Sequence, residues 1–293
     1  MMSASNMVKK WLLPPGIYEG LSAIKQSLNG PGTEAQLRGF QSNLQFKNIY
    51  KNQTVFICAT GPSINTQDLS CLIGRYAISV SSFFLHPLAR KIAPCAHVFA
   101  SNHKPFRFEN LDHYYSGIRK QLPPETPIFA GNLPYEYGHL EYLSTHPQMM
   151  PKSFHLLPVK EGECLSENNF RDDRLWDIAR SVFVARTVLY HALQIAFYMG
   201  FDKIVLLGCD HDYLNDTARV ANHHFYSEGS GFSDANHLGQ FTSERWFYEY
   251  YSRWRDYRLM DTFCRERGVR IYNATEGGML DVFERAKLSL LIS

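Results

Sequence analysis

The stretch SVFVARTVLYHALQIAFYMGFDKIVLLGCDHDY, residues 181–213, combines a helix pattern with a strand pattern that follows it directly. Apolar residues fall at nearly every turn position of 181–200, which predicts a helix packed on both sides, and Gly200 supplies its C-terminal stop. The apolar run KIVLLG (203–208) predicts a buried strand. A buried helix that leads straight into a buried strand is typical of a parallel α/β sheet.

The same alternation of strands and helices extends over most of the chain. Five further apolar runs predict strands: TVFICA (54–59), RYAISVSSF (75–83), AHVFASN (96–102), TPIFAG (126–131) and VRIYNA (269–274). A helix is predicted to start near Thr66, with Asp68 in its first turn, and a long amphipathic helix covers 243–268, with Ser243 as its N-cap. We therefore expect an α/β fold with a mostly parallel sheet and helices on both faces.

The length of 293 residues favours one core with additions over two full domains. Residues 1–50 form a predicted N-terminal appendage. Residues 51–293 form a single α/β domain with a variable insertion at about 131–175, a lid or small subdomain, and a long loop at 209–242. The pair Pro14-Pro15 leaves the apolar run before it too short for a signal peptide. The appendage is either a simple leader or a lysine-flanked Trp/Leu surface that rests on a membrane.

Composition places the chain among ordinary globular proteins, with 45% hydrophobic and 20% charged residues. The net charge of +2 comes without a basic run, so we expect no nucleic-acid partner. No stretch approaches the ~18–20 apolar residues of a membrane span. The six cysteines lack CxxC spacing, which fits buried thiols in a reducing cytoplasm. We expect a cytoplasmic location, at the inner face of the membrane if the appendage is membrane-proximal.

Small polar residues follow each of five predicted strands. These tips are 59–63 (ATGPS), Ser81 with Ser82, 101–103 (SNH), 210–213 (DHDY), and Asn273 with 275–278 (TEGG). Ligands of open α/β sheets bind beyond the carboxyl ends of the strands. The shared polarity therefore predicts a nucleotide-type site at this edge, although strand tips are also ordinary polar turns.

The tips differ in what they can do. The ATGPS tip lacks both GxGxxG and GK[ST], so neither phosphate motif applies. Gly61 would let the backbone approach a ligand closely, and Ser63 would donate to it or cap a helix. The TEGG tip, placed at the start of a final helix, would hold an anion on backbone N–H groups or form a capped loop.

The DHDY tip and the histidine-bearing loop at 221–229 carry the candidate chemistry. Asp210 and Asp212 have the spacing to share Mg²⁺, or Asp210 caps a turn. Tyr213 is a phenol donor for a departing phosphate or a packed aromatic residue. His223 or His224 suits a general base for a hydroxyl nucleophile, or both are surface or structural histidines. Spacing of the HExxH or CxxC kind is absent, so no zinc site is predicted.

The order of these motifs resembles a bacterial superfamily of DUF115 type. That superfamily includes small sialyltransferases, motility-accessory factors that glycosylate flagellin with nonulosonic acids, and an archaeal 6-hydroxymethylpterin diphosphokinase. The resemblance covers about 54–285 and rests on GPS, GFDKIVLLGCDHDY, a histidine followed by an aromatic residue, and YNATEGG. It implies a Rossmann-like, modified GT-A-like fold with a lid and, in the sialyltransferase branch, a CMP-sugar donor.

The resemblance also implies a role for each matching residue. Those expected to bind the donor are Gly61, Pro62, Ser63, Ser81, Asn102, Arg186, Thr187, Asn273, Thr275, Glu276 and Gly277. Among them, Ser81 stands where the family has an asparagine, and Arg186 matches only approximately. Asp210 closes a GxD motif, Tyr213 lies near a tyrosine that helps the phosphate leave, and His224 matches the catalytic base. A second family tyrosine has no clear match.

The function implied is inverting transfer of a nonulosonic acid from a CMP donor to a glycan or glycoprotein acceptor, in cell-surface polysaccharide assembly. No metal or other cofactor is required in this branch. One alternative is an Mg²⁺-dependent diphosphokinase that uses Asp210 and Asp212, and another is a catalytically silent nucleotide-binding member. The sequence leaves open the acceptor, the donor sugar, the linkage, the oligomeric state and which of His223 and His224 is the base.

Overall fold

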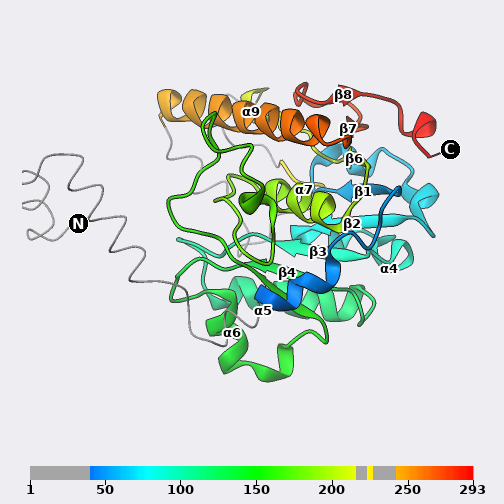
Figure 1. Ribbon diagram of the computed structural model, residues 1–293. Helices are drawn as coiled ribbons and strands as arrows, with labels where there is room; N and C mark the ends of the chain where they lie inside the picture. Colours follow the sequence, from blue (N-terminus) through cyan, green and yellow to red (C-terminus); the bar gives the residue numbers. More distant parts are fainter. Residues whose placement is uncertain (1–39, 216–222, 227–241, 293) are drawn as a thin grey trace, which may run out of the picture. The chain divides into compact units, whose positions relative to one another are not determined.

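The computed structural model describes residues 40–215, 223–226 and 242–292. The chain divides into two compact units, 1–39 and 40–293, and the description concerns the second unit (Figure 1). Most of the predicted appendage at 1–50 and most of the predicted loop at 209–242 lie outside the described residues.

The described chain is built on an eight-stranded sheet with the order β5-β4-β3-β2-β1-β6-β7-β8. Every pairing between neighbouring strands is parallel. The strands are β1 (Thr54–Cys58), β2 (Tyr76–Val80), β3 (Ala96–Phe99), β4 (Ile128–Gly131), β5 (Phe154–Leu157), β6 (Lys203–Leu207), β7 (Arg270–Asn273) and β8 (Glu284–Arg285). The predicted α/β fold class is therefore confirmed.

The strand order reverses direction next to β1. From β1 the chain moves outward through β2, β3, β4 and β5, and then returns to pair β6 with β1 before it continues to β7 and β8. The run β3-β2-β1-β6-β7-β8 follows the doubly wound order 3-2-1-4-5-6, with β4 and β5 added at one edge. In such sheets the crevice for a ligand opens at the reversal, here between the carboxyl ends of β1 and β6.

The central strands are apolar throughout because both faces of the sheet are covered. In β1, Val55 and Ile57 belong to one buried core, and Phe56 and Cys58 belong to the other. The helices on the first face are α7 (Val188–Met199) and α9 (Ser243–Glu266). Those on the second are α4 (Ala89–Ile92), α5 (Phe108–Gln121) and α6 (His139–Thr145). Figure 1 shows the two groups on opposite sides of the sheet, so helices on both faces are confirmed.

Short 3-10 helices fill the connections. They are η1 (Ser42–Phe46), η2 (Pro62–Asn65), η3 (Leu69–Leu72), η4 (Ser81–Leu85), η5 (Pro147–Met149), η6 (Asp173–Trp176), η7 (Tyr213–Asn215) and η8 (Leu288–Leu290). Two of them replace the helix predicted near Thr66, which was wrong: η2 and η3 follow β1, and Asp68 caps η3 by accepting from Ser70 N at 2.9 Å.

Two helix boundaries and one whole helix also differ from the prediction. The long buried helix starts at Val188 and not at 181, because Thr187 caps it and Val182 instead forms a parallel bridge with Val159. Thr242 caps α9 in place of Ser243. The predicted helix does not start at the TEGG tip, since 275–283 is a loop that leads into β8. Within 181–187 only Val182 and Phe183 are buried, and they pack against the core without being part of a helix.

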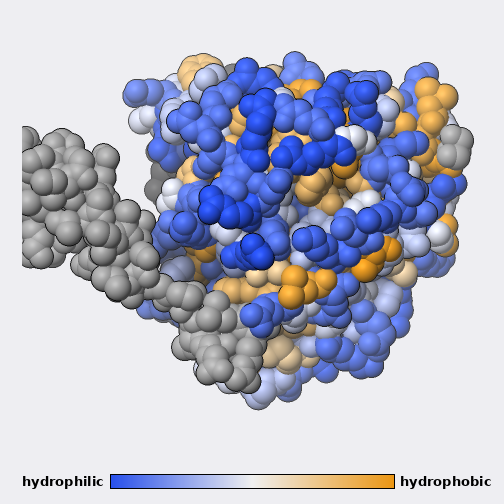
Figure 2. Space-filling view, viewed as in Figure 1, coloured by the Kyte–Doolittle hydropathy of each residue, from blue (hydrophilic) through white to orange (hydrophobic). Residues whose placement is uncertain are grey.

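The sequence patterns did not predict two of the strands. β5 lies within the predicted variable insertion at 131–175 and joins the same sheet as β4. β8 has two residues, too few to show a period of two. In the part of the chain that the structure describes, no helix has both the length and the apolar character to cross a membrane. Hydrophilic residues predominate on the face shown in Figure 2.

Candidate functional site

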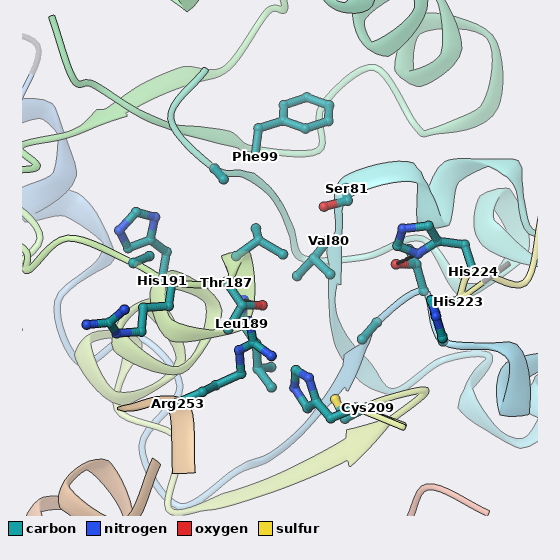
Figure 3. Close-up of a pocket in the computed structure, with 18 of the residues that line it drawn as sticks. Val80, Ser81, Phe99, Thr187, Leu189, His191, Cys209, His223, His224 and Arg253 are labelled. Carbon is teal, nitrogen blue, oxygen red and sulfur yellow. Dashed lines mark hydrogen bonds between the residues drawn. The ribbon is translucent and has the colours of Figure 1, made fainter. Parts of the chain in front are cut away.

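A cavity of about 610 Å³ opens where the strand order reverses. This volume is within the ~300–1,000 Å³ typical of small-molecule pockets. Strand tips and the start of α7 and of α9 line it. The predicted residues among its lining are Gly61, Ser81, Asn102, Arg186, Thr187, Asp210, Asp212, Tyr213, His223 and His224. In Figure 3, Phe99 and Ser81 lie on one side of the cavity and His191 and Arg253 on the other.

Gly61, Ser63 and Asp210 form what we call the switch-point floor. The Gly61 N–H donates to Gly208 O at 2.8 Å, which joins the loop after β1 to the loop after β6. Asp210 accepts from Ser63 N at 3.2 Å on Oδ1 and from Ser63 Oγ at 2.8 Å on Oδ2. A Cβ atom at Gly61 would lie 1.8 Å from Asp210 Oδ2. Glycine is therefore required so that the carboxylate can reach Ser63.

Asp210 is 7% exposed, and burial raises the pKa of its carboxyl group. The hydrogen bonds from Ser63 act in the opposite direction because they stabilise the charged form. Both carboxylate oxygens of Asp210 therefore accept hydrogen bonds from within the protein. Asp210 therefore fixes the shape of the GPS tip.

The loop after β7 is hydrogen-bonded to Asp210 of the switch-point floor and to the adjacent Cys209. Thr275 Oγ1 accepts from Cys209 N at 3.0 Å, and Met279 N donates to Asp210 O at 2.7 Å. Asn273 holds this loop in shape by accepting from Thr275 N at 3.0 Å and donating to Leu280 O at 2.8 Å.

The predicted residues outside the cavity lining are Pro62, Ser63, Asn273, Thr275, Glu276 and Gly277.

The other three residues of the DHDY tip, His211, Asp212 and Tyr213, each have different surroundings. His211 has a left-handed backbone (φ 48°), and its Nε2 lies 2.8 Å from the Tyr257 hydroxyl on α9. Burial, aided by the positive charge of Arg253, lowers the pKa of His211 to about 3. Asp212 Oδ1 lies 3.6 Å from His223 Nδ1. Tyr213 lines the cavity.

Asp210 and Asp212 therefore face different partners. Among the described residues no three His, Cys, Asp or Glu side chains are grouped as metal ligands. A shared Mg²⁺ would require Asp210 to leave Ser63, so these two carboxylates do not fit a preformed metal pair.

His224 is held at the edge of the cavity by the loop after β1. Its Nδ1 lies 3.1 Å from Thr60 Oγ1, and its ring stacks on Tyr226 with centroids 5.1 Å apart. The adjacent Phe225 N–H donates to Thr60 O at 2.9 Å, and Asn65 Nδ2 donates to Phe225 O at 2.9 Å. In the tautomer that donates from Nδ1 to Thr60 Oγ1, Nε2 is the basic nitrogen. An oriented histidine of this kind can act as a general base.

Three of the other predicted lining residues, Asn102, Thr187 and Arg186, have structural partners. Asn102 Nδ2 donates to Tyr137 O at 2.6 Å, and Thr187 caps α7. Ser81 has a left-handed backbone (φ 47°) at the end of β2. Arg186 is bound to α9, with Nη1 2.7 Å from Glu249 and Nε 3.3 Å from Asp256. Arg186 therefore joins the start of α7 to α9.

Sequence patterns missed Arg253 and His191, which form what we call the α7–α9 wall. Both line the cavity. Arg253 Nε and Nη1 are buried and have no hydrogen-bond partner among the described residues. The guanidinium carbon lies 5.8 Å from the ring centroid of Tyr213 and 5.7 Å from that of Tyr250.

His191 is 1% exposed, with Nε2 3.3 Å from Phe183 O. That contact places the proton on Nε2 and leaves Nδ1 as an acceptor, which has no partner in the described chain. Burial lowers the pKa of His191 to about 4, so the ring is neutral at neutral pH.

One signal in the sequence could have found Arg253. It stands three residues after Tyr250 and four before Tyr257, on the face of α9 that packs inward. A charged residue at a core-facing helix position needs a partner. The carboxylates at helical spacing are Glu249, four residues before it, and Asp256, three residues after it, and only the structure shows that both bind other arginines.

The fold and the cavity together define a doubly wound α/β protein with a small-molecule site at the reversal of strand order. Searches with family models and among curated proteins find no match. Among solved structures, the chain is similar to the sialyltransferase CstII from Campylobacter jejuni in complex with a substrate analogue, cytidine-5'-monophosphate. The identity is 14% over 82% of this chain and 87% of that chain, with a TM-score of 0.48.

A second similar structure is the monofunctional alpha-2,3-sialyltransferase Cst-I from Campylobacter jejuni. It is 13% identical over 78% of this chain and 78% of that chain, with a TM-score of 0.43. CstII in complex with a trisaccharide acceptor and CMP is 12% identical over 75% of this chain and 80% of that chain, with a TM-score of 0.40. Values in this range assign neither a family nor an activity to the chain.

Proposed function

We propose that this protein is a sialyltransferase-like glycosyltransferase that moves a nonulosonic acid from a CMP donor to a hydroxyl group of a glycan or glycoprotein. The observation that carries the proposal is the placement of His224, which Thr60 orients at the edge of a cavity that opens at the reversal of strand order. The order of motifs from GPS to YNATEGG supports the choice of donor.

In this proposal the residues divide the chemistry of a single displacement. His224 Nε2 takes the proton of the acceptor hydroxyl, whose oxygen attacks the anomeric carbon of the donor sugar. The bond from that carbon to the phosphate oxygen breaks, and CMP departs with the electron pair. Tyr213, on the cavity lining, donates a hydrogen bond to the departing phosphate. Attack opposite the leaving group inverts the anomeric centre.

In this proposal the other predicted residues either contact the donor directly or hold the switch-point floor in shape. Gly61, Ser81, Asn102 and Thr187 line the cavity and are the proposed direct contacts. The loop after β7 works through Cys209 and Asp210, to which it is hydrogen-bonded. The proposed setting is cell-surface polysaccharide assembly in the cytoplasm, at the inner face of the membrane.

The arrangement of carboxylates favours this proposal over the diphosphokinase alternative. That alternative needs Asp210 and Asp212 to share Mg²⁺, whereas Asp210 accepts two hydrogen bonds from Ser63 and Asp212 faces His223. We propose that the transfer requires no metal.

Nucleotide binding is the first test. Thermal unfolding of the whole chain is measured with CMP, CDP, UDP and ATP, each with and without Mg²⁺. Because a ligand that binds the folded state raises its unfolding temperature, we expect CMP to stabilise the protein without Mg²⁺. Stabilisation by ATP alone, and only with Mg²⁺, would instead support the diphosphokinase. No response to any nucleotide would count against both enzymatic alternatives.

Loss of the base is the second test. We expect His224→Gln to slow sugar transfer from CMP-sialic acid by ~10²–10⁴-fold, the usual contribution of a general base, with CMP affinity unchanged. CMP release is followed with a panel of glycan acceptors. The matched control is His223→Gln in the same loop, and a larger loss in the control would move the role of base to His223.

A further inference from the structure

Arg253 differs from the other arginines of α9. Four of them are paired with carboxylates: Arg245 with Glu249, Arg255 with Asp256, Arg258 with Glu167 and Arg265 with Asp261. Arg253 forms no ion pair with any described residue, although it is part of the same helix and lines the cavity.

The carboxylates nearest to Arg253 along α9 are already engaged. Glu249, four residues before it, is bound by Arg186 at 2.7 Å and by Arg245 at 2.5 Å. Asp256, three residues after it, is bound by Arg186 at 3.3 Å and by Arg255 at 2.6 Å. The helix therefore offers Arg253 no internal counter-ion at the usual spacing of three or four residues.

The surroundings of the guanidinium group are aromatic. The rings of Tyr213 and Tyr250 lie within 6 Å of it, and the positive charge is felt by His211, whose pKa it helps to lower. Contact with aromatic faces stabilises a cation but does not satisfy its N–H groups. Buried N–H groups without an acceptor are costly, and native proteins retain few of them.

We propose that Arg253 binds an oxyanion of the ligand, either a phosphate or a carboxylate, and that Tyr213 donates to the same group. A planar guanidinium presents paired N–H donors that match two oxygens of either anion. The inference rests on the proposed function for the identity of the ligand, because a CMP-activated nonulosonic acid carries both a phosphate and a carboxylate.

The experiment uses isothermal titration of the whole chain with cytidine, CMP and a fluorinated CMP-sialic acid. Wild type is compared with Arg253→Gln, which removes the charge, and Arg253→Lys, which keeps it. Arg258→Gln is the matched control, since Arg258 is on the same helix in an exposed ion pair. If the phosphate is bound, Arg253→Gln weakens CMP by ~10–100-fold, the cost of leaving a charged hydrogen-bonded group unpaired, and leaves cytidine unchanged.

A carboxylate partner gives a different pattern. Arg253→Gln then leaves both cytidine and CMP unchanged and weakens only the fluorinated CMP-sialic acid. In either case Arg253→Lys restores part of the lost affinity, and the control binds all three ligands as wild type does. Equal affinities of Arg253→Gln and wild type for every ligand would overturn the inference.

Two further outcomes separate this inference from the proposed function. If wild type binds no cytidine nucleotide, the proposed function fails. The oxyanion site would still be supported by a rise in unfolding temperature with pyrophosphate that Arg253→Gln abolishes. If Arg253→Gln weakens cytidine as much as CMP and also lowers the unfolding temperature without ligand, Arg253 is a structural residue and the inference is wrong.

Discussion

The switch-point floor and the α7–α9 wall face the same cavity and use their polar groups in opposite ways. On the floor, Asp210 and Ser63 satisfy each other at 2.8 and 3.2 Å. On the wall, Arg253 Nε and Nη1 and His191 Nδ1 have no hydrogen-bond partner in the described chain. The floor carries the conspicuous motifs, GPS and DHDY, whereas the wall carries none. A motif can thus mark hydrogen bonds that hold loops together, while the polar atoms without a partner stand on elements that carry no motif.

The largest expected effect is on the floor, from Gly61→Ala. The backbone of Gly61 (φ −66°) suits any residue, but a Cβ there meets Asp210 Oδ2 at 1.8 Å and Gly208 O at 2.6 Å. Gly208 O is a backbone atom and cannot rotate away as a side chain can. We therefore expect Gly61→Ala to lower the free energy of unfolding by ~3 kcal/mol or more. Urea unfolding measures it.

Gly74→Ala is the control, with the opposite properties. Gly74 has φ +81° and no atom within 4 Å of an added Cβ. Only the left-handed backbone resists alanine there, at a cost of ~1–2 kcal/mol. Gly61→Ala that is no more destabilising than Gly74→Ala would show that Asp210 can move away, and the contrast between floor and wall would weaken.

The second-largest expected effect is the pH dependence of stability that arises from His191, the buried histidine of the α7–α9 wall. Burial lowers the pKa of His191 to about 4, below its value in the unfolded chain. The unfolded chain therefore binds the proton first as pH falls, so this stability is complete above about pH 6.5 and is lost toward pH 4. Between about pH 7 and pH 5 we expect a loss of ~2 kcal/mol from this one residue.

Urea unfolding of wild type and His191→Leu across that pH range tests the expectation. The variant should take up one proton fewer on unfolding at low pH, which flattens the dependence of stability on pH. An unchanged slope would mean that His191 already titrates in the folded protein.

The smallest effect is the coupling within the floor. In a double-mutant cycle with Ser63→Ala and Asp210→Asn, we expect a coupling of ~1–2 kcal/mol, as for hydrogen bonds to a charged group. Because burial raises the pKa of Asp210, the charged form is disfavoured and stability falls as pH rises through that pKa. Relative to wild type, Asp210→Asn should therefore be less destabilising at pH 7 than at about pH 4. A coupling near zero would contradict the role of Asp210 as the anchor of the GPS tip.

Local patterns predicted the sheet well. The runs at 54–59, 96–102 and 203–208 contain β1, β3 and β6 because strands buried on both faces are apolar throughout. Elements without such a pattern were missed or misplaced. β8 is too short to show a period, and Val182 and Phe183 are apolar because they are buried outside any helix.

The cavity lies at the edge of the sheet where the sequence predicts a site, and His224 and Tyr213 line it. The predicted helix after TEGG was wrong. Its place is taken by a loop whose Thr275 and Met279 hold Cys209 and Asp210. A turn-like sequence does not reveal whether its polar atoms face a ligand or a neighbouring loop.

The sequence by itself determined the alternation of strands and helices and the polarity of the strand tips, because both follow from residues close together in the chain. Only the tertiary structure decided which polar groups are satisfied. Ser63 and Asp210 meet across 147 positions of sequence, and Arg253 has no carboxylate left because Glu249 and Asp256 bind other arginines. Hydrogen-bond satisfaction depends on all the groups that folding brings together, so it cannot be inferred from a segment alone.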